Sequence, residues 1–247
     1  MLKSQENVSK GEGRLTIALD ISHFTESTSG PLTSQQLDDA WDLGVRAFRP
    51  NIAKQDVAVR QIDAIVDYGN TTGRVFNIWT YRYYYFGSSL IQADADKAFI
   101  QRVRDLKYNI QLHSIDIEDT NPDITTDQRI QETAQLINKF EGFCSTDLYT
   151  AYWYWTQYMG NVIKFSFMPL WFADWDNIPN LEVSPQFGGF TKGHMKQYAG
   201  DQYFAGIWCD LNYYEEAIIL PPNPQPPVEE PTLIRVSPNK LYRFEVE

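Results

Sequence analysis

The feature that most constrains this fold is a repeated alternation of β-rich runs with amphipathic, helix-compatible stretches between residues 15 and 142. Runs such as "RLTIALDI" and "VRAFRPNI" are each followed by a stretch whose apolar residues recur at near-helical spacing. Alternating strands and helices predict a parallel sheet. A chain of 247 residues is long enough to close that sheet into a TIM-like β/α barrel.

Residues that begin and end helices support this pattern. Thr33 or Ser34 is placed to cap a helix that ends near Gly44. The stretch "QDVAVRQIDAIVDYG" predicts a helix that stops at Gly69, and "TTDQRIQETAQLINKFEG" predicts one that closes at Gly142. The alternation weakens after this point, so we expect the barrel to lose its regular helices in the C-terminal third.

Composition divides the chain into four segments. Residues 1–14 are polar and are expected to be flexible, and the barrel is expected to span residues 15–219. The Pro-rich segment "LPPNPQPPVEEP", residues 220–231, cannot form a core helix or a central strand and predicts a stiff linker. Residues 232–247 form a tail too short to be a domain, which we expect to pack on the barrel or to attach to a larger assembly.

Charge and hydropathy limit the partners. The net charge is -11 and the sequence pI is about 4.7, so we expect no binding to nucleic acid or to an anionic membrane. The longest apolar stretch is far shorter than the roughly 20 residues that span a bilayer. The opening "MLKSQENVSKGEGR" lacks the apolar core of a signal peptide, so we expect no secretory signal in this sequence.

Cysteine and histidine spacing gives little support to a cofactor. Cys144 and Cys209 form no CxxC or Cys/His pattern, which favours two buried thiols over a disulfide or a reactive role. His113 and His194 have no partner at metal-ligand spacing, so structural roles are favoured for both. The sequence predicts neither a cofactor nor an essential metal.

The segment "SIDIED" carries the chemistry of most interest. Side chains alternate along a strand, so Asp116 and Glu118 point the same way, at the strand end where β/α barrels hold their active sites. Repulsion between the two carboxylates would let one keep its proton near neutral pH, as a general acid in glycoside cleavage must. Acidic residues end many strands, however, so this pair alone leaves a purely structural role open.

Further acids and aromatic residues fall at matching places. Asp20 ends the first predicted strand in "IALDIS" and Asp210 ends the last in "GIWCDLN", and these strands are neighbours in a closed barrel. Aromatic-rich segments "WTYRYYYF", "YTAYWYW" and "LWFADW" also fall at predicted strand ends, where rings can line a sugar-binding groove. The candidate substrate contacts are Tyr152, Trp153, Trp171, Trp175 and Gln197, and core packing is the alternative for each.

With these segments in order, the chain resembles glycoside hydrolase family 25, the Chalaropsis-type lysozymes or N-acetylmuramidases. The resemblance runs from "LDIS" through "SIDIED", "YTAYWYW", "PLWFADW" and "KQYAG" to "GIWCDLNYY", covering residues 15 to about 216. It implies a barrel of five strand-helix units and three plain strands, (β/α)5(β)3.

The resemblance also implies roles for the acids. It places the general acid/base at Glu118. It assigns Asp116 to the substrate's 2-acetamido group or to the positive transition state. Asp20 and Asp210 would hold the substrate and tune the protonation of the pair. Cleavage could then proceed through a covalent intermediate or, as we favour, through the substrate's own acetamide.

Two departures from the family pattern concern the substrate. Family members often carry a Gln after the first-strand motif and a His in the third-strand aromatic cluster, where this chain reads "DISHFTE" and "YRYYYF". His23 is a partial replacement or a structural histidine. Trp175 stands where the family usually has Tyr, which changes the floor of the groove. These differences bear on the glycan more than on the reaction type.

The resemblance implies hydrolysis of the β-1,4 bond between N-acetylmuramic acid and N-acetylglucosamine in bacterial peptidoglycan. A wall-degrading enzyme without a signal peptide is reminiscent of phage endolysins or virion-attached lysins. A chitinase-like family 18 hydrolase is disfavoured, because Gln111 and Ser114 stand where that pattern has Asp. A binding or structural module that keeps the barrel without catalysis is the remaining alternative.

Overall fold

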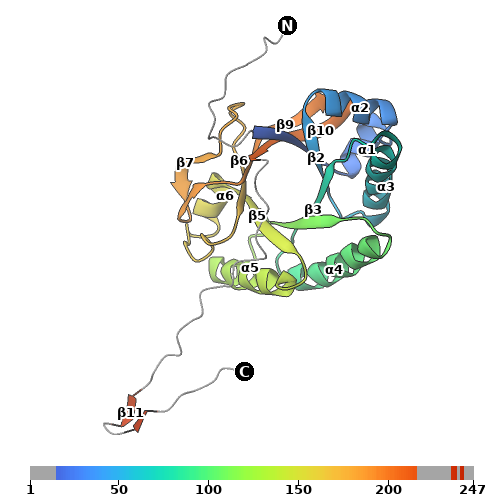
Figure 1. Cartoon of the computed structure of the whole chain (residues 1–247). Helices are drawn as coiled ribbons and strands as arrows, with labels where there is room; N and C mark the ends of the chain where they lie inside the picture. Colours follow the sequence, from blue (N-terminus) through green and yellow to red (C-terminus); the bar gives the residue numbers. More distant parts are fainter. Residues whose placement is uncertain (1–14, 216–234, 238–239, 242–247) are drawn as a thin grey trace.

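The computed structural model describes residues 15–215, 235–237 and 240–241, and its main feature is a closed barrel of eight strands. Their order around the barrel is β1-β10-β9-β6-β5-β4-β3-β2, which confirms the predicted TIM-like barrel (Figure 1). The strands are β1 (Leu15–Ile21), β2 (Val45–Pro50), β3 (Asn77–Tyr83), β4 (Ile110–Asp116), β5 (Ser145–Ala151), β6 (Leu170–Ala173), β9 (Met195–Phe204) and β10 (Ile207–Glu215).

Helices cover the barrel unevenly. They are α1 (His23–Ser29) and α2 (Ser34–Asp42) after β1, α3 (Gln55–Thr72) after β2, α4 (Ser89–Asp105) after β3, α5 (Thr126–Phe140) after β4 and the short α6 (Tyr152–Gln157) after β5. Between β6 and β9 the chain forms a hairpin of β7 (Glu182–Phe187) and β8 (Phe190–Lys192) instead of a helix. Figure 1 shows α2 to α5 around one part of the barrel and α6 with β7 around another, so the regular helices are lost where the sequence predicts.

The sheet is not wholly parallel, which corrects one prediction. β10 runs antiparallel to both β9 and β1, while the other neighbouring strands are parallel. Ala205 and Gly206 join β9 to β10 with positive φ angles of 53° and 76°, a tight turn that leaves no room for a crossover helix. Asp210 therefore lies near the start of its strand, not at its end as predicted. It reaches the same mouth as Asp20 because β10 runs in reverse.

Helix boundaries also test the sequence signals. Thr33 caps α2, with Gln36 completing a capping box, as predicted. Helix α3 was expected to stop at Gly69 but continues to Thr72, because the left-handed residue that ends it is Gly73 (φ 76°).

The barrel interior decides which side chains reach the mouth. One side chain from each barrel strand forms an inner cluster: Ala18, Ala47, Trp79, Leu112, Tyr149, Trp171, Met195 and Tyr214. A second, larger core lies between the strands and the helices. Since side chains alternate along a strand, Asp20 and Gln197, two positions beyond Ala18 and Met195, also point inward.

The predicted flexible segment 1–14 and the predicted linker 220–231 lie outside the described residues, and their roles remain predictions. Of the predicted tail, the structure describes β11 (Arg235–Ser237) and β12 (Lys240–Leu241), which pair antiparallel. Among the helices that are described, none combines the length and the apolar character needed to cross a bilayer.

Candidate active site

Asp116 and Glu118 lie at the barrel mouth. Asp116 ends β4, and the Ile117 N–H donates to the Tyr149 carbonyl (2.9 Å), which ties the chain after β4 to β5. Asp116 is only 5% exposed, and its Oδ1 has no hydrogen-bond partner among the described residues. Glu118 is half-buried. The structure thus holds two carboxyl groups together at the end of one strand.

Burial changes the protonation of this pair. Burial raises the pKa of Glu118 from 4.5 to about 7. The pKa of Asp116 is raised well above its ordinary value by burial first, and then by the charges of Glu118 and Asp20. The sequence predicts that one carboxyl keeps its proton near neutral pH through mutual repulsion. The pKa shift has that direction, but burial is its larger cause.

Asp20 and Asp210 form a second acidic pair on the adjoining strands. They are register partners in the β1–β10 ladder, so their side chains lie beside each other. Gln197 Nε2 donates to Asp20 Oδ2 (2.8 Å) and Asp210 Oδ2 (3.2 Å), and Asn212 Nδ2 donates to Asp20 Oδ2 (3.1 Å). Burial raises the pKa of both acids, and the charge of Asp210 raises that of Asp20 further. The mouth therefore holds four carboxyl groups that bind protons more tightly than usual.

Two cavities open beside these acids. The aromatic cavity has a volume of about 530 Å³, and Glu118, Tyr149, Tyr152, Trp153, Trp175 and Phe187 are among its lining residues. The acidic cavity, about 590 Å³, is lined by Asp20, Asp116, Asp201 and Asp210 with rings that include His23, Phe24, Tyr81, Tyr83 and Trp208. Glu118 lines one cavity and Asp116 the other, so the D-x-E pair borders both.

The predicted contact residues fall into three positions. Tyr152 (43% exposed), Trp153 (49%) and Trp175 (59%) present rings in the aromatic cavity. Gln197 lies between the acids and is buried. Trp171 is only 1% exposed, inside the barrel, and lines neither cavity. The three exposed rings can stack on a flat ligand, whereas Gln197 and Trp171 lie beneath them.

Several residues of the site were not singled out from the sequence. Tyr149 lines the aromatic cavity, and Tyr81 and Asp201 line the acidic one. Asn212 bonds Asp20 from the neighbouring strand. Strand alternation carries the signal for Asn212, which lies two positions after Asp210. Asp201 depends on the β9–β10 hairpin, which the sequence did not reveal.

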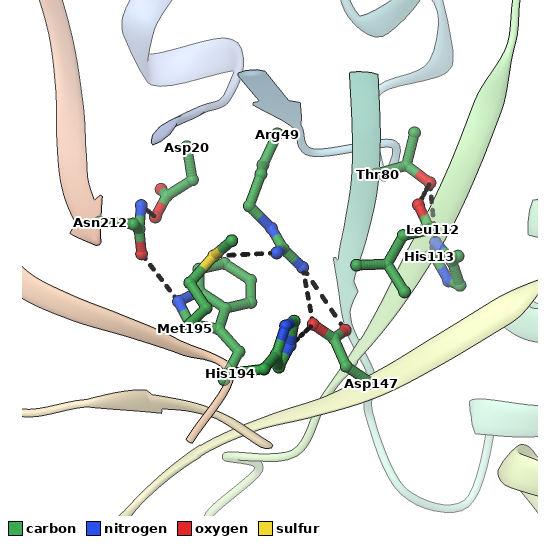
Figure 2. Close-up of polar contacts among 10 residues, drawn as sticks. Asp20, Arg49, Thr80, Leu112, His113, Asp147, His194, Met195 and Asn212 are labelled. Carbon is green, nitrogen blue, oxygen red and sulfur yellow. Dashed lines mark hydrogen bonds and ion pairs between the residues drawn. The ribbon is translucent and has the colours of Figure 1, made fainter. Parts of the chain in front are cut away.

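Inside the barrel, below these acids, lies a compensated charge cluster (Figure 2). The Arg49 guanidinium contacts Asp147 (Nη2 to Oδ2, 3.3 Å) and lies over the ring of Trp171, 3.9 Å from its centroid. His194 Nε2 lies 2.6 Å from Asp147 Oδ2. Burial alone would raise the pKa of Asp147, but Arg49 and His194 outweigh it and hold that pKa well below its usual range. This cluster pairs every charge with an opposite or hydrogen-bonding partner.

His113, Cys144 and Cys209 are buried or half-buried, and Cys209 also lines the acidic cavity. His113 is buried between Thr80 and Tyr84, and burial lowers its pKa to about 3. Cys144 and Cys209 are both free thiols, the first half-buried and the second buried. Among the described residues, no three His, Cys, Asp or Glu side chains are arranged to hold a metal ion.

The sequence also matches a known protein family. A family profile described as "Glycosyl hydrolases family 25" matches residues 58–207, more than half of the chain. The chain belongs to glycosyl hydrolases family 25. The matched region of this family 25 chain contains β3 to β9 and both members of the D-x-E pair.

Individual relatives are distant. "Probable GH family 25 lysozyme 5" of Dictyostelium discoideum is 36% identical over 77 residues, 31% of this chain and 36% of that protein. "Counting factor 50" of the same organism is 35% identical over 89 residues, 35% of this chain and 28% of that protein. The matches span 26% to 36% of the length of the curated relatives. The activity of this family 25 chain is therefore inferred from its site.

Solved structures share the fold. The modular autolysin LytC of Streptococcus pneumoniae superposes with a TM-score of 0.55 and 16% identity, covering 81% of this chain and 46% of LytC. At this identity the likeness concerns the barrel and its topology. It agrees with the closed arrangement of eight strands in this family 25 chain.

Proposed function

We propose that this protein is a peptidoglycan hydrolase that cleaves the β-1,4 bond between N-acetylmuramic acid and N-acetylglucosamine, with Glu118 as general acid/base. Family membership and relatives named as lysozymes support the reaction class. LytC, which shares the fold, is described in complex with a synthetic peptidoglycan ligand. Bacterial peptidoglycan is accordingly the proposed partner.

The observation that carries the proposal is the position and pKa of Glu118. Its pKa of about 7 leaves a large share of the carboxyl protonated at neutral pH, as donation to a glycosidic oxygen requires. Glu118 lines the aromatic cavity, and Asp116, two residues earlier, lines the acidic one. A glycan that occupied both cavities would place the bond between two sugars beside Glu118.

Asp116 suits a role toward the substrate's acetamido group. Its Oδ1 is buried and unpartnered among the described residues, so it can accept an N–H from a bound sugar. That hydrogen bond would hold the acetamide oxygen for attack on the anomeric carbon. We therefore favour cleavage assisted by the substrate over a covalent glycosyl-enzyme. Asp20 and Asp210 would complete the acidic cavity around the same sugar.

Stacking on exposed rings supplies the proposed affinity for the glycan. Tyr152, Trp153 and Trp175 come from α6 and the segment after β6, and all line the aromatic cavity. Sugar faces pack well on such rings because both surfaces are flat and partly apolar. Trp171 is buried, so we propose that it supports Arg49 from below.

The test is product analysis with a matched pair of variants. Purified protein, Glu118→Gln and Glu141→Gln are incubated with peptidoglycan, soluble products are reduced with borohydride, and the reduced ends are identified by mass spectrometry. Glu141 is an exposed residue at the C-cap position of α5, away from both cavities, so its replacement controls for the change of charge. We expect reduced muramic acid ends from the native protein and Glu141→Gln, and none from Glu118→Gln.

Other outcomes identify the alternatives. Reduced glucosamine ends would keep a hydrolase and overturn the bond assignment. Sedimentation with several wall types, without released fragments from any protein, would make the barrel a binding module.

A further inference from the structure

Gln197 uses every hydrogen-bonding atom of its side-chain amide within the site. Oε1 accepts from Tyr149 Oη (2.9 Å) and from Trp175 Nε1 (2.8 Å). Nε2 donates to one carboxylate oxygen each of Asp20 (2.8 Å) and Asp210 (3.2 Å). An indole N–H can only donate, so Trp175 fixes the orientation of the amide. The oxygen faces the aromatic side and the NH₂ group faces the acids.

The same contacts distribute the protons of the acidic pair. Both oxygens of Asp210 accept hydrogen bonds, Oδ2 from Gln197 and Oδ1 from the backbone N–H of Asp201 (2.6 Å). Asp20 Oδ2 accepts from Gln197 and Asn212, which leaves Oδ1 to carry a proton. Burial raises the pKa of Asp210, and the hydrogen bond with Asp20 offsets part of that rise. These contacts favour the proton on Asp20 and the negative charge on Asp210.

Trp175 is the most exposed of the three rings in the aromatic cavity, at 59%. Its ring lies across the backbone of Gly200, where an added Cβ would fall 2.5 Å from the indole Cζ2. The backbone of Gly200 thus supports one face of the ring, and Gln197 holds its N–H edge. The direction of the exposed face therefore depends on Gln197.

We propose that Gln197 is a positioning residue that couples the stacking face of Trp175 to the Asp20–Asp210 pair. One rigid amide joins a ring of the aromatic cavity to two acids of the acidic cavity, over contacts of 2.8 to 3.2 Å. A glycan that shifts the indole changes the hydrogen bonds at the acids. A change of charge at the acids changes the hydrogen bond of Gln197 to the indole N–H. Its effect on turnover rests on the proposed function, whereas the coupling itself is a property of the free protein.

Other groups share the electrostatic surroundings of this amide and its acids. They are Arg49 from β2, Tyr81 from β3, Asp116 and Glu118 at the end of β4, Tyr149 from β5, Asp201 from β9 and Cys209 from β10. Arg49 is the cation of this set, and its charge offsets a small part of the rise that burial causes in the pKa of Asp20. A test of the coupling must therefore change Gln197 and leave these groups in place.

The indole N–H of Trp175 provides a direct readout. In ¹H–¹⁵N spectra its resonance is identified by its loss in Trp175→Phe, and its shift is followed from pH 4 to 9. We expect this resonance to titrate with the acidic pair in the native protein and to stop doing so in Gln197→Leu. In Gln197→Glu the midpoint should rise by about one pH unit, because a third carboxylate then faces the pair. Gln186→Glu adds the same charge on the exposed face of β7 and should leave the midpoint unchanged.

Three results would overturn the coupling. They are a native Trp175 resonance that is flat over this range, an unchanged titration in Gln197→Leu, or the native midpoint in Gln197→Glu. The last result decides the matter even if Gln197→Leu does not fold. If the protein also cleaves peptidoglycan, Gln197→Glu should shift the acid limb of its kcat/KM profile in the same direction. An absence of cleavage would count against the proposed function and leave the titration as the test of the coupling.

Discussion

Carboxyl groups inside the barrel and at its mouth have pKa values that are shifted in opposite directions. Asp147, inside the barrel, meets Arg49 and His194, and its pKa lies well below the ordinary range. Asp116, at the mouth, is buried without a cation in contact, and its pKa lies well above that range. The two residues are nearly equally inaccessible, at 0% and 5% exposed.

The difference lies in whether a cation offsets the effect of burial, because burial disfavours the charged form of both residues. A buried carboxylate with a cation beside it remains ionised and fixes the structure around it. A buried carboxyl group without one keeps its proton and can exchange it with a ligand. Asp116 is of the second kind, and it lies at the mouth with Asp20, Glu118 and Asp210, whose pKa values are also raised.

The largest expected effect is on turnover at the mouth. Asp116→Asn should lower the rate of peptidoglycan release by about 10²-fold to 10⁴-fold, the range typical of a lost acid–base or electrostatic group. Its free energy of unfolding should stay equal to or above the native value, because a buried, repelled carboxyl group is removed. Release of soluble fragments and urea unfolding at pH 7 measure the two quantities. A variant that is inactive and also strongly destabilised would place Asp116 among the structural acids.

The second effect is on stability inside the barrel. Asp147→Asn leaves Arg49 buried without its anion, so the free energy of unfolding should fall by about 3 to 5 kcal/mol. The same urea titration measures it. Arg49→Met combined with Asp147→Leu removes both charges and should recover much of the loss. If the double variant is no more stable than Asp147→Asn, an unpaired Arg49 is not the cause.

Much of the fold follows from the sequence because its signals are local. The Thr33 cap and the alternation of strands and helices depend on neighbouring residues, and both appear in the structure. The reversed β10 was missed because its cause is a two-residue turn, Ala205–Gly206, whose φ angles the sequence pattern does not state. The predicted end of α3 at Gly69 was wrong for a similar reason. Of Gly69 and Gly73, only Gly73 adopts the left-handed conformation that ends the helix.

The sequence predicts where the candidate site residues lie along the strands, but not how deeply each side chain is buried. Strand periodicity brings Asp20 and Asp116 to one mouth, and Asp210 joins them there because β10 runs in reverse. Periodicity does not say how much water a side chain meets, so Trp171 and Trp175 looked alike in "LWFADW". They are 1% and 59% exposed in the structure. The contacts of Gln197 join residues from β1, β5, β9 and β10, an arrangement that exists only after the barrel closes.

The pH dependence of stability sharpens the contrast between the two groups. Glu118 has a folded pKa of about 7 against an ordinary 4.5, so the folded state binds the extra proton between these values. Its contribution is present at low pH and is lost as pH rises through 7. Asp147, with a lowered pKa, gains nothing further in this window, since its contribution is lost only on acidification below its ordinary value of 3.8. Thermal midpoints at pH 5 and pH 8 should differ by a few degrees more for the native protein than for Glu118→Gln. Equal differences would show that Glu118 titrates normally.

The smallest effect concerns approach to the mouth. Among the described residues, the linings of both cavities contain no Lys or Arg, and the whole chain has a net charge of -11. A wall rich in carboxylates or phosphates should therefore be repelled at low ionic strength, and added salt should screen that repulsion. Raising NaCl from 20 to 200 mM should increase the initial rate on an anionic wall by a few-fold and leave the rate on a short neutral oligosaccharide unchanged. Asp201→Asn at the rim of the acidic cavity should weaken this salt dependence, and Asp105→Asn at the C-terminal end of α4 should not. A rate that falls with salt on the anionic wall would instead indicate a cationic surface that binds it, and the cavity linings offer none.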